Sequence, residues 1–249
     1  MEENILPEPI QIEETNEPKE HFEIWSNAQR SKNLIIAFWL MFGLTLLASV
    51  SDYYEIMLLK DMAAGEILSD EVITSSDTRQ RVLAIIQMIG MVVSAILFIC
   101  WFRRAYGNLD RIKQDPLHSE SMAVWSFIIP IICLFRPVQM MYEIWNKTQD
   151  KIKELDSNYT IQPNRFSIGV WWFLFIISHF IGRYLMSAAF DDNKTMESII
   201  TLSQAYMVSD VLQVIEAFLV IVIINNMADI EAKLADEVNR NGGDVVFTS

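Results

Sequence analysis

The sequence has few of the residues that metal sites, redox sites and most enzymes need. Its 249 residues include two cysteines, three histidines and eight glycines. The histidines, His21, His118 and His179, are far apart and show no HExxH spacing. No glycine-rich phosphate loop of the Walker type and no G-x-S-x-G motif occurs. The sequence therefore predicts no catalytic, cofactor-binding or metal-binding residues, and we expect a protein that is not an enzyme.

A disulfide is not expected either. Cys100 and Cys133 both lie in apolar runs. Both are expected near the cytoplasmic ends of their segments, where thiols stay reduced. A reduced cysteine in such a place acts as a small packing side chain.

Positive charge is scarce. The chain has 19 Lys and Arg against 32 Asp and Glu, a formal net charge of −13. This acidity argues against nucleic acid as a partner, since nucleic acid binding depends on basic surface.

Long uncharged apolar runs, in contrast, are abundant. The chain is 52% hydrophobic, and these residues gather in blocks rather than at amphipathic helical spacing. About 20 apolar residues are needed to cross a hydrocarbon core about 30 Å thick. We expect spans at about 34–51, 82–102, 166–190 and 198–228, which makes 34–228 a membrane domain. The predicted fold class is all-α, an integral membrane helical bundle in a phospholipid bilayer.

Both ends of the chain are polar. Residues 1–33 hold eight acids against three bases, and we expect an acidic, mobile tail without a secretory signal. The alternative for residues 21–32 is an interfacial helix anchored by Phe22 and Trp25. Residues 229–249 are expected to begin as a polar extension of the last helix and to continue as a polar tail.

A fifth apolar run, residues 122–135, is too short to cross as a helix. It contains Pro130 and is followed at once by Arg136 and Pro137. Proline removes a backbone donor and disfavours helix at the residue before it, so a break is expected near both prolines. Residues 137–155 then have the pattern of an amphipathic helix, of the kind that lies at a membrane surface.

The lysines and arginines outside the spans bear on whether the short run crosses. If it crosses, they divide eight to ten between the two sides, and if it re-enters they divide fourteen to four. The positive-inside rule favours the second arrangement. In it the chain crosses four times, the short run 122–135, third in chain order, re-enters the membrane, and both termini lie in the cytoplasm. The alternative is a broken helix that completes a fifth crossing, since irregular backbone is tolerated where protein or water satisfies it.

Three segments resemble a known family. They are WFRRAYGNLD (Trp101–Asp110), IPIICLFRPVQMMYEIW (Ile129–Trp145) and GVWWFLFIIS (Gly169–Ser178). Over about residues 80–225 the chain is similar to a bacterial multi-pass membrane family catalogued as domain of unknown function 4328. The resemblance implies the fold and a bacterial origin, and it brings no established activity. It also marks the motif positions to test: Arg103, Arg104, Tyr106, Asn108, Pro130, Arg136, Pro137, Glu143 and Trp145.

Seven of these residues form a candidate cytoplasmic surface site: Arg103, Arg104, Tyr106, Asn108, Arg136, Glu143 and Trp145. Under the four-crossing topology the first two motifs lie together on the cytoplasmic surface. Arg103 or Arg104 is then expected to pair with Glu143. Arg136 remains for a lipid phosphate or a group of backbone carbonyls. The alternative is that these residues are ordinary interfacial anchors beside aromatic side chains.

A second candidate set lies within the spans: His179, Arg183, Asp210, Gln213 and Glu216. Their spacing of three or four places each group on one helix face. A hairpin that turns near residues 192–195 brings His179 opposite Asp210. Ionisable groups are costly in lipid unless paired, so we expect all five to face one another. The cluster is either a polar clamp between two helices or a proton or ion relay.

Two functions are compatible with these features. The first is a non-enzymatic scaffold or accessory protein of the bacterial cytoplasmic membrane, which contacts lipid headgroups or a partner protein. The second is a small oligomeric transporter, or an ion or proton conductor, built around the intramembrane cluster. A homo-oligomer or a membrane protein partner fits either function.

Overall fold

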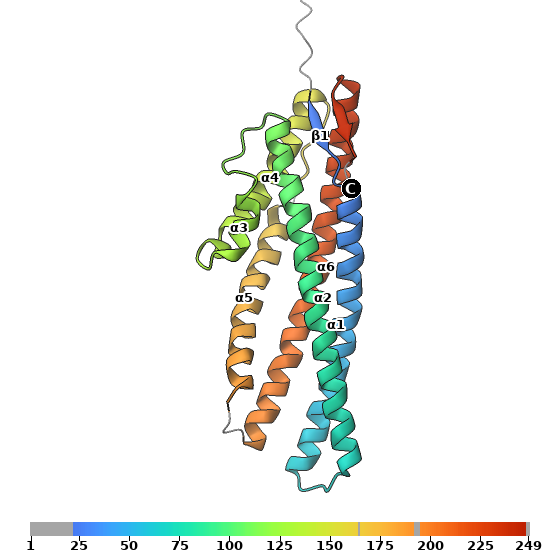
Figure 1. The fold of residues 1–249 in the computed structure, drawn as a ribbon, viewed down its shortest axis with the longest axis vertical. Coiled ribbons are helices and arrows are strands. Elements are labelled where there is room, and N and C mark those ends of the chain that lie inside the picture. The colour runs from blue at the N-terminus through green and yellow to red at the C-terminus, as the bar shows by residue number, and fades with distance from the viewer. Residues whose placement is uncertain (1–21, 164, 192–194, 248–249) are drawn as a thin grey trace, which may run out of the picture.

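Four long helices form the body of the protein. The computed structural model describes residues 22–163, 165–191 and 195–247. The long helices are α1 (Ala28–Ala63), α2 (Asp70–Arg111), α5 (Arg165–Ala189) and α6 (Met196–Arg240) (Figure 1). Each is long and apolar enough to cross a membrane, which confirms the expected all-α bundle. α1, α2 and α6 extend well beyond their apolar runs, so only residues 64–69 separate α1 from α2.

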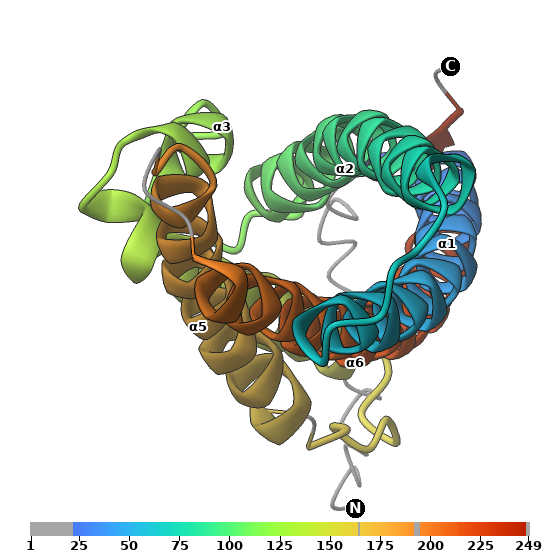
Figure 2. The same ribbon diagram turned by 90° about the horizontal axis from the view of Figure 1, so that it is seen from below.

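The long helices follow one another around the bundle. α1 packs against both α2 and α6, and α5 packs against α6. Viewed along the bundle, α2, α1, α6 and α5 form an open arc (Figure 2). The turn expected between the last two helices includes residues 192–194, which lie outside the described part of the chain.

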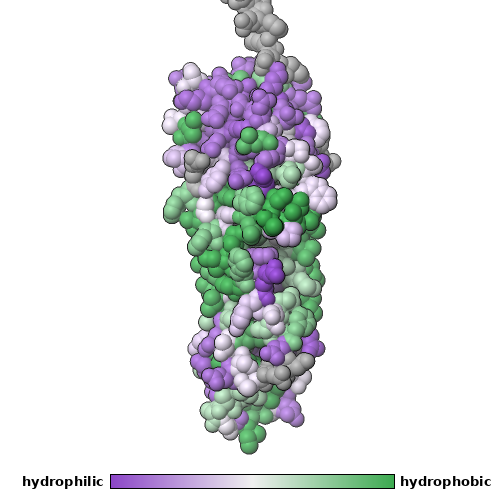
Figure 3. Space-filling model, turned by 90° about the vertical axis from the view of Figure 1, so that its left-hand side faces the viewer, coloured by the Kyte–Doolittle hydropathy of each residue, from purple (hydrophilic) through white to green (hydrophobic). Residues whose placement is uncertain are grey.

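The chain between α2 and α5 stays at one end of the bundle. It contains α3 (Met122–Ile128), the 3-10 turn η1 (Ile132–Leu134) and α4 (Arg136–Leu155). This end also holds the start of α1 and the end of α6 (Figure 1). On the face shown in Figure 3 this end is hydrophilic, whereas the middle of the bundle is mostly hydrophobic. We call this end the head, and define it as residues 22–27, 103–163 and 229–247.

A pair of short parallel strands joins the two ends of the described chain. β1 (Glu23–Trp25) pairs with β2 (Asp244–Val246). The alternative of an interfacial helix over residues 21–32 is therefore wrong for residues 23–25, and α1 begins at Ala28. The reason is tertiary, since Phe22 and Ile24 are buried in the head core. Residues 1–21 of the expected acidic tail lie outside the described residues.

The proline-containing run forms a hairpin within the head. α3 ends before Ile129, which is extended (φ −78°, ψ 118°) as expected for a residue that precedes proline. The chain turns at Pro130, forms η1 and enters α4. Arg136 was expected outside helix, but α4 begins at this residue, with Pro137 in its first turn. Proline is tolerated there because the N–H groups of a first turn have no intrahelical acceptor.

The amphipathic helix α4 is a core element of the head. Its apolar residues Met140, Met141, Ile144 and Trp145 are almost fully buried. They pack where α4 meets α2, α5 and α6. The apolar face that the sequence pattern suggested for a membrane surface is thus covered by protein.

Candidate functional site in the head

A buried tyrosine–glutamate contact is the centre of the head. The Tyr106 hydroxyl, from α2, donates to Glu143 Oε2, from α4, at 2.7 Å. Glu143 Oε1 also accepts the Leu117 backbone N–H at 2.8 Å and the Lys147 ammonium at 2.9 Å. Tyr106 is fully buried and the Glu143 side chain is only 10% exposed. Two helices and a loop therefore share one carboxylate.

The loop attached to this contact is residues 112–121. The His118 backbone N–H donates to the Tyr106 hydroxyl at 3.0 Å, and the Lys147 ammonium donates to the Asp115 carbonyl. Two non-glycine residues of the loop, Lys113 and Asp115, have positive φ angles of 56° and 41°. Such left-handed backbone is strained for residues with a Cβ and persists only where contacts hold it. The contacts to Glu143, Tyr106 and Lys147 supply that restraint.

An arginine–histidine contact connects the same loop to the start of α4. Arg136 Nη1 lies 2.6 Å from His118 Nε2. Arginine can only donate, so Nε2 accepts and the imidazole is neutral, with its proton on Nδ1. Burial and the nearby Arg136 charge hold the pKa of His118 below its ordinary value. The contact therefore exists only in the neutral state of His118.

The pKa of Glu143 is also displaced. Burial alone raises it, but the hydrogen bonds from Leu117, Lys147 and Tyr106 outweigh burial, and the net pKa lies below its ordinary value. Glu143 is thus a charged acceptor at neutral pH. Its role in the structure is to hold the loop and the two helices together.

The other candidate residues are divided between surface and interior. Arg103 is exposed and pairs with Glu120 at 2.9 Å, not with Glu143 as the sequence suggested. Arg104 is buried, and its guanidinium lies 4.7 Å from the centre of the Trp25 ring. The prediction that Arg103 pairs with Glu143 is wrong. Glu143 pairs with Lys147 instead, and Arg103 pairs with Glu120 from the loop.

Asn108 and Trp145 hold chain segments in place. The Asn108 side chain accepts the Trp25 backbone N–H at 3.1 Å and donates to the Trp25 carbonyl at 2.8 Å, as a neighbouring strand would. The buried Trp145 indole donates to the Gln162 carbonyl at 3.1 Å. Asn108 therefore fixes β1 against α2, and Trp145 fixes the segment that leads into α5.

A polar cavity of about 590 Å³ lies beside this network, under the loop. Tyr106, Arg111, His118 and Glu120 are among the residues that line it. Within the described residues, no three His, Cys, Asp or Glu side chains are placed to hold a metal ion. Two of the charges in the cavity wall pair with each other, since Arg111 Nη2 lies 3.7 Å from Glu120 Oε2.

The intramembrane set does not form the single cluster expected. Asp210 is buried and accepts from Gln87 of α2 at 3.4 and 3.5 Å, and Glu216 accepts from Ser178 of α5. Gln213 donates to Ser209 of its own helix at 3.3 Å.

His179 and Arg183 are exposed on α5. The expectation that all five residues face one another is therefore wrong. Ser178 contacts Glu216, whereas the hairpin assumed from the sequence placed His179 opposite Asp210. This difference in register turns the side chains of His179 and Arg183 away from α6.

Four functional residues of the head were not found from the sequence: Leu117, His118, Glu120 and Lys147. Leu117 and His118 contribute backbone N–H groups, which no side-chain pattern reveals. His118 was noted only for the absence of a metal spacing. Lys147 is four residues after Glu143 in a helical pattern, and this spacing was the one signal that could have identified the pair.

These observations define a multi-pass helical membrane protein with a folded polar head at one end. The chain belongs to the family described as domain of unknown function (DUF4328), whose model matches residues 64–229. The match confirms the resemblance carried by the Trp101–Asp110 and Ile129–Trp145 motifs. No curated protein and no solved structure matches the chain.

Proposed function

We propose that this protein is a non-enzymatic membrane scaffold or accessory protein. Its four long helices anchor a rigid head, which contacts lipid headgroups or a partner protein. The observation that carries the proposal is the network around Glu143, which holds a strained loop and two helices in one arrangement. A pre-formed surface of this kind loses little conformational entropy on binding.

We also propose that the head lies on the cytoplasmic side of a bacterial inner membrane. Among the described residues outside the spans, thirteen lysines and arginines belong to the segments at the head end, and three belong to the opposite end. The positive-inside rule assigns the richer end to the cytoplasm. Both described ends of the chain are then cytoplasmic, because β1 and β2 pair there.

A small transporter or ion conductor is the second candidate. The buried contact between Gln87 and Asp210 supports it, with the Asp52 carboxylate of α1 nearby. Intramembrane carboxylates are often part of ion or proton pathways. Against this candidate, His179 and Arg183 lie on the outer surface of α5 and do not continue a polar path from Asp210.

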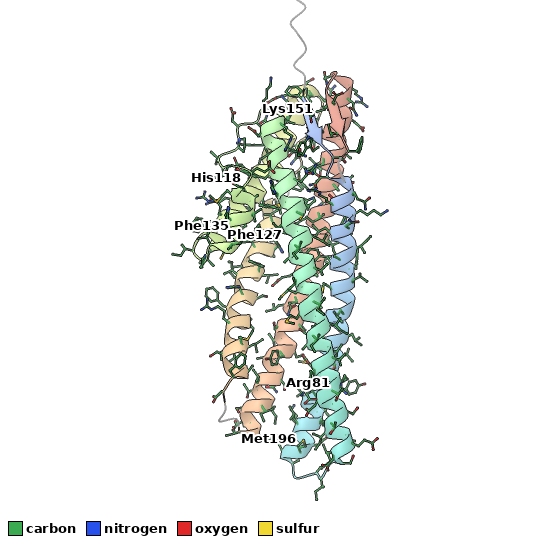
Figure 4. The ribbon with its side chains drawn as sticks, in the orientation of Figure 1. Arg81, His118, Phe127, Phe135, Lys151 and Met196 are labelled. Atoms are coloured by element: carbon green, nitrogen blue, oxygen red, sulfur yellow. The ribbon has the colours of Figure 1, made fainter. Side chains whose placement is uncertain are left out.

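Site-specific photo-crosslinking in native membranes tests the scaffold proposal. A photoreactive amino acid replaces Arg103 in the head, and the matched control replaces Arg81, an exposed arginine at the opposite end of α2 (Figure 4). We expect one defined phospholipid or protein adduct at position 103 and none of the same identity at 81. Identical adducts at both positions, or none at 103, would contradict a head-specific contact.

Flux measurements separate the two candidates. Proteoliposomes that contain the wild-type protein are given a pH gradient, with the Asp210→Asn variant as the comparison. The scaffold proposal predicts the same slow decay of the gradient for both proteins and for empty vesicles. Flux in the wild type that Asp210→Asn abolishes would overturn it in favour of a conductor.

A further inference from the structure

The hairpin of α3 and η1, residues 122–135, exposes apolar side chains although it belongs to the hydrophilic head. Ile131, at its turn, is 73% exposed, and Trp125 and Ile128 are each more than half exposed. The segment contains no charged residue. Exposed apolar side chains gathered in one short segment mark a site of contact with a membrane or with another protein.

Aromatic contacts place α3 below the charged rim of the head. The Phe127 ring packs edge-on against Phe98 at 5.7 Å and against Phe102 at 5.4 Å. Phe98 and Phe102 belong to the uncharged run of α2 that ends before Arg103. Since a helix rises about 1.5 Å per residue, Phe98 lies about 8 Å inside the first charge. Phe127 is therefore at the depth of the span.

A hydrogen bond places η1 at a similar depth on the other side. The Trp172 indole of α5 donates to the Leu134 carbonyl at 3.0 Å. Trp172 is seven residues from the start of α5, which corresponds to about 10 Å along the helix. Figure 4 agrees, because Phe127 and Phe135 lie farther from the polar end than Lys151 and His118. Two independent contacts thus give the hairpin the same depth.

Four backbone N–H groups of the hairpin have partners of the kind that a lipid environment requires. The N–H groups of Ile129, Cys133, Leu134 and Phe135 donate to carbonyls within the hairpin. Pro130 has no N–H to satisfy, and its carbonyl accepts from the Cys133 thiol. Irregular backbone enters hydrocarbon only where such groups are satisfied.

We infer that the α3–η1 hairpin is inserted into the head-side leaflet of the bilayer and binds lipid acyl chains through Trp125, Ile128 and Ile131. A depth of about 10 Å is less than one leaflet, which is about half of a 30 Å core. Acyl chains are the occupant because the apolar surface continues the hydrophobic band formed by the long helices (Figure 3). The inference deepens the proposed function and rests on it, since it assigns the lipid contact of the head to this hairpin.

Spin-label accessibility in vesicles tests the insertion. Single cysteines replace Ile131, Leu117 or Leu40 in the full chain after Cys100→Ala and Cys133→Ala. The three positions have closely matched exposure, at 73%, 76% and 70%, but lie in the hairpin, the head loop and a span. Labels are reconstituted in vesicles of phosphatidylethanolamine and phosphatidylglycerol, and their collisions with oxygen and with a water-soluble nickel chelate are compared.

We expect the Ile131 label to collide more with oxygen than with the chelate, as the Leu40 label does, while the Leu117 label shows the reverse. A chelate accessibility at 131 equal to that at 117 would overturn the inference. Poor access of both reagents to 131 would also overturn it, since protein or a second copy would then cover the site. Ile128→Cys provides the same readout if Ile131→Cys does not fold.

Failure of the insertion and failure of the proposed function give different results. An aqueous hairpin leaves the crosslinks at position 103 unaffected, whereas loss of those crosslinks leaves the accessibility of position 131 unaffected.

Discussion

The head and the membrane-spanning part use polar side chains in opposite ways. In the head, Glu143 accepts a backbone N–H, a tyrosine hydroxyl and an ammonium, and these contacts hold a loop. In the spans, Asp210 and Glu216 each meet a side chain of a neighbouring helix. Only 11% of the residues in the most apolar 18-residue stretch of α2 are buried within the protein. The head therefore has a protein core, whereas the spans rely on lipid to cover them.

The difference follows from where backbone groups are free. A helix in a membrane satisfies its own N–H and C=O groups, so a polar side chain there finds only other side chains. A loop leaves backbone groups unsatisfied, and a buried carboxylate can fix it by accepting them. A carboxylate in the head therefore fixes the backbone of a loop, whereas a carboxylate in the spans connects two helices whose backbone groups are already satisfied.

The largest expected effect comes from Glu143→Ala. It leaves the Tyr106 hydroxyl and the Leu117 N–H without their acceptor and the Lys147 ammonium without its carboxylate partner, and removing one partner of a buried ion pair costs about 3–5 kcal/mol. The measurement is the free energy of unfolding in detergent micelles. Glu216→Ala, in a span, is the matched comparison, with an expected loss of about 1 kcal/mol or less. Equal losses would abolish the contrast between the two regions.

Tyr106→Phe is expected to have the next largest effect. The variant keeps the ring but leaves the His118 N–H without its acceptor, and a buried unsatisfied group costs about 1–3 kcal/mol. Hydrogen exchange of the 112–121 loop amides should accelerate together with the loss of stability. Tyr54→Phe removes a hydroxyl from an exposed tyrosine of α1 and should change neither quantity. Unchanged exchange in the loop of Tyr106→Phe would contradict the role of the hydroxyl.

We expect the head to become less stable as the pH is lowered, because His118 takes up a proton. Its pKa in the folded protein is below the ordinary value of 6.5, so the unfolded chain takes up the proton first. The contribution of neutral His118 is complete above that value and is lost as the pH falls below it, by at most about 1.4 kcal/mol per pH unit. Unfolding is measured from about pH 7.5 to about pH 5.5. The His118→Gln variant should lose this dependence, and an identical slope would disprove the assignment.

The smallest expected effect is a gain from Lys113→Gly. α2 ends in a Schellman motif, with Gln114 N–H bonded to the Leu109 carbonyl and Lys113 N–H to the Asp110 carbonyl. Glycine at the left-handed position relieves the strain of a Cβ, for a net gain of at most about 1 kcal/mol. Thermal unfolding should show the gain for glycine and none for Lys113→Ala, which keeps the Cβ. A gain of the same size for alanine would show that the backbone is not strained.

Local sequence features predicted the elements well and their contacts less well. The apolar runs gave the four long helices, and Pro130 gave the break that follows α3. The residues of the head site were found through the family motifs, yet their partners were not, because Arg103 meets Glu120 and Glu143 meets Lys147. One of these partners, Glu120, belongs to the loop 112–121, and nothing in the composition of the loop shows how it folds back.

By itself, the sequence determined that this protein has four helices long and apolar enough to cross a membrane and that a fifth apolar run is interrupted. The physical reason is that hydrophobic length and proline act locally, on the segment that contains them. The tertiary structure alone decided that α4 is a core helix, that β1 pairs with β2 and that His179 and Arg183 face outward. Those outcomes depend on the register and rotation of one helix against another. Contacts between residues distant in the sequence determine both.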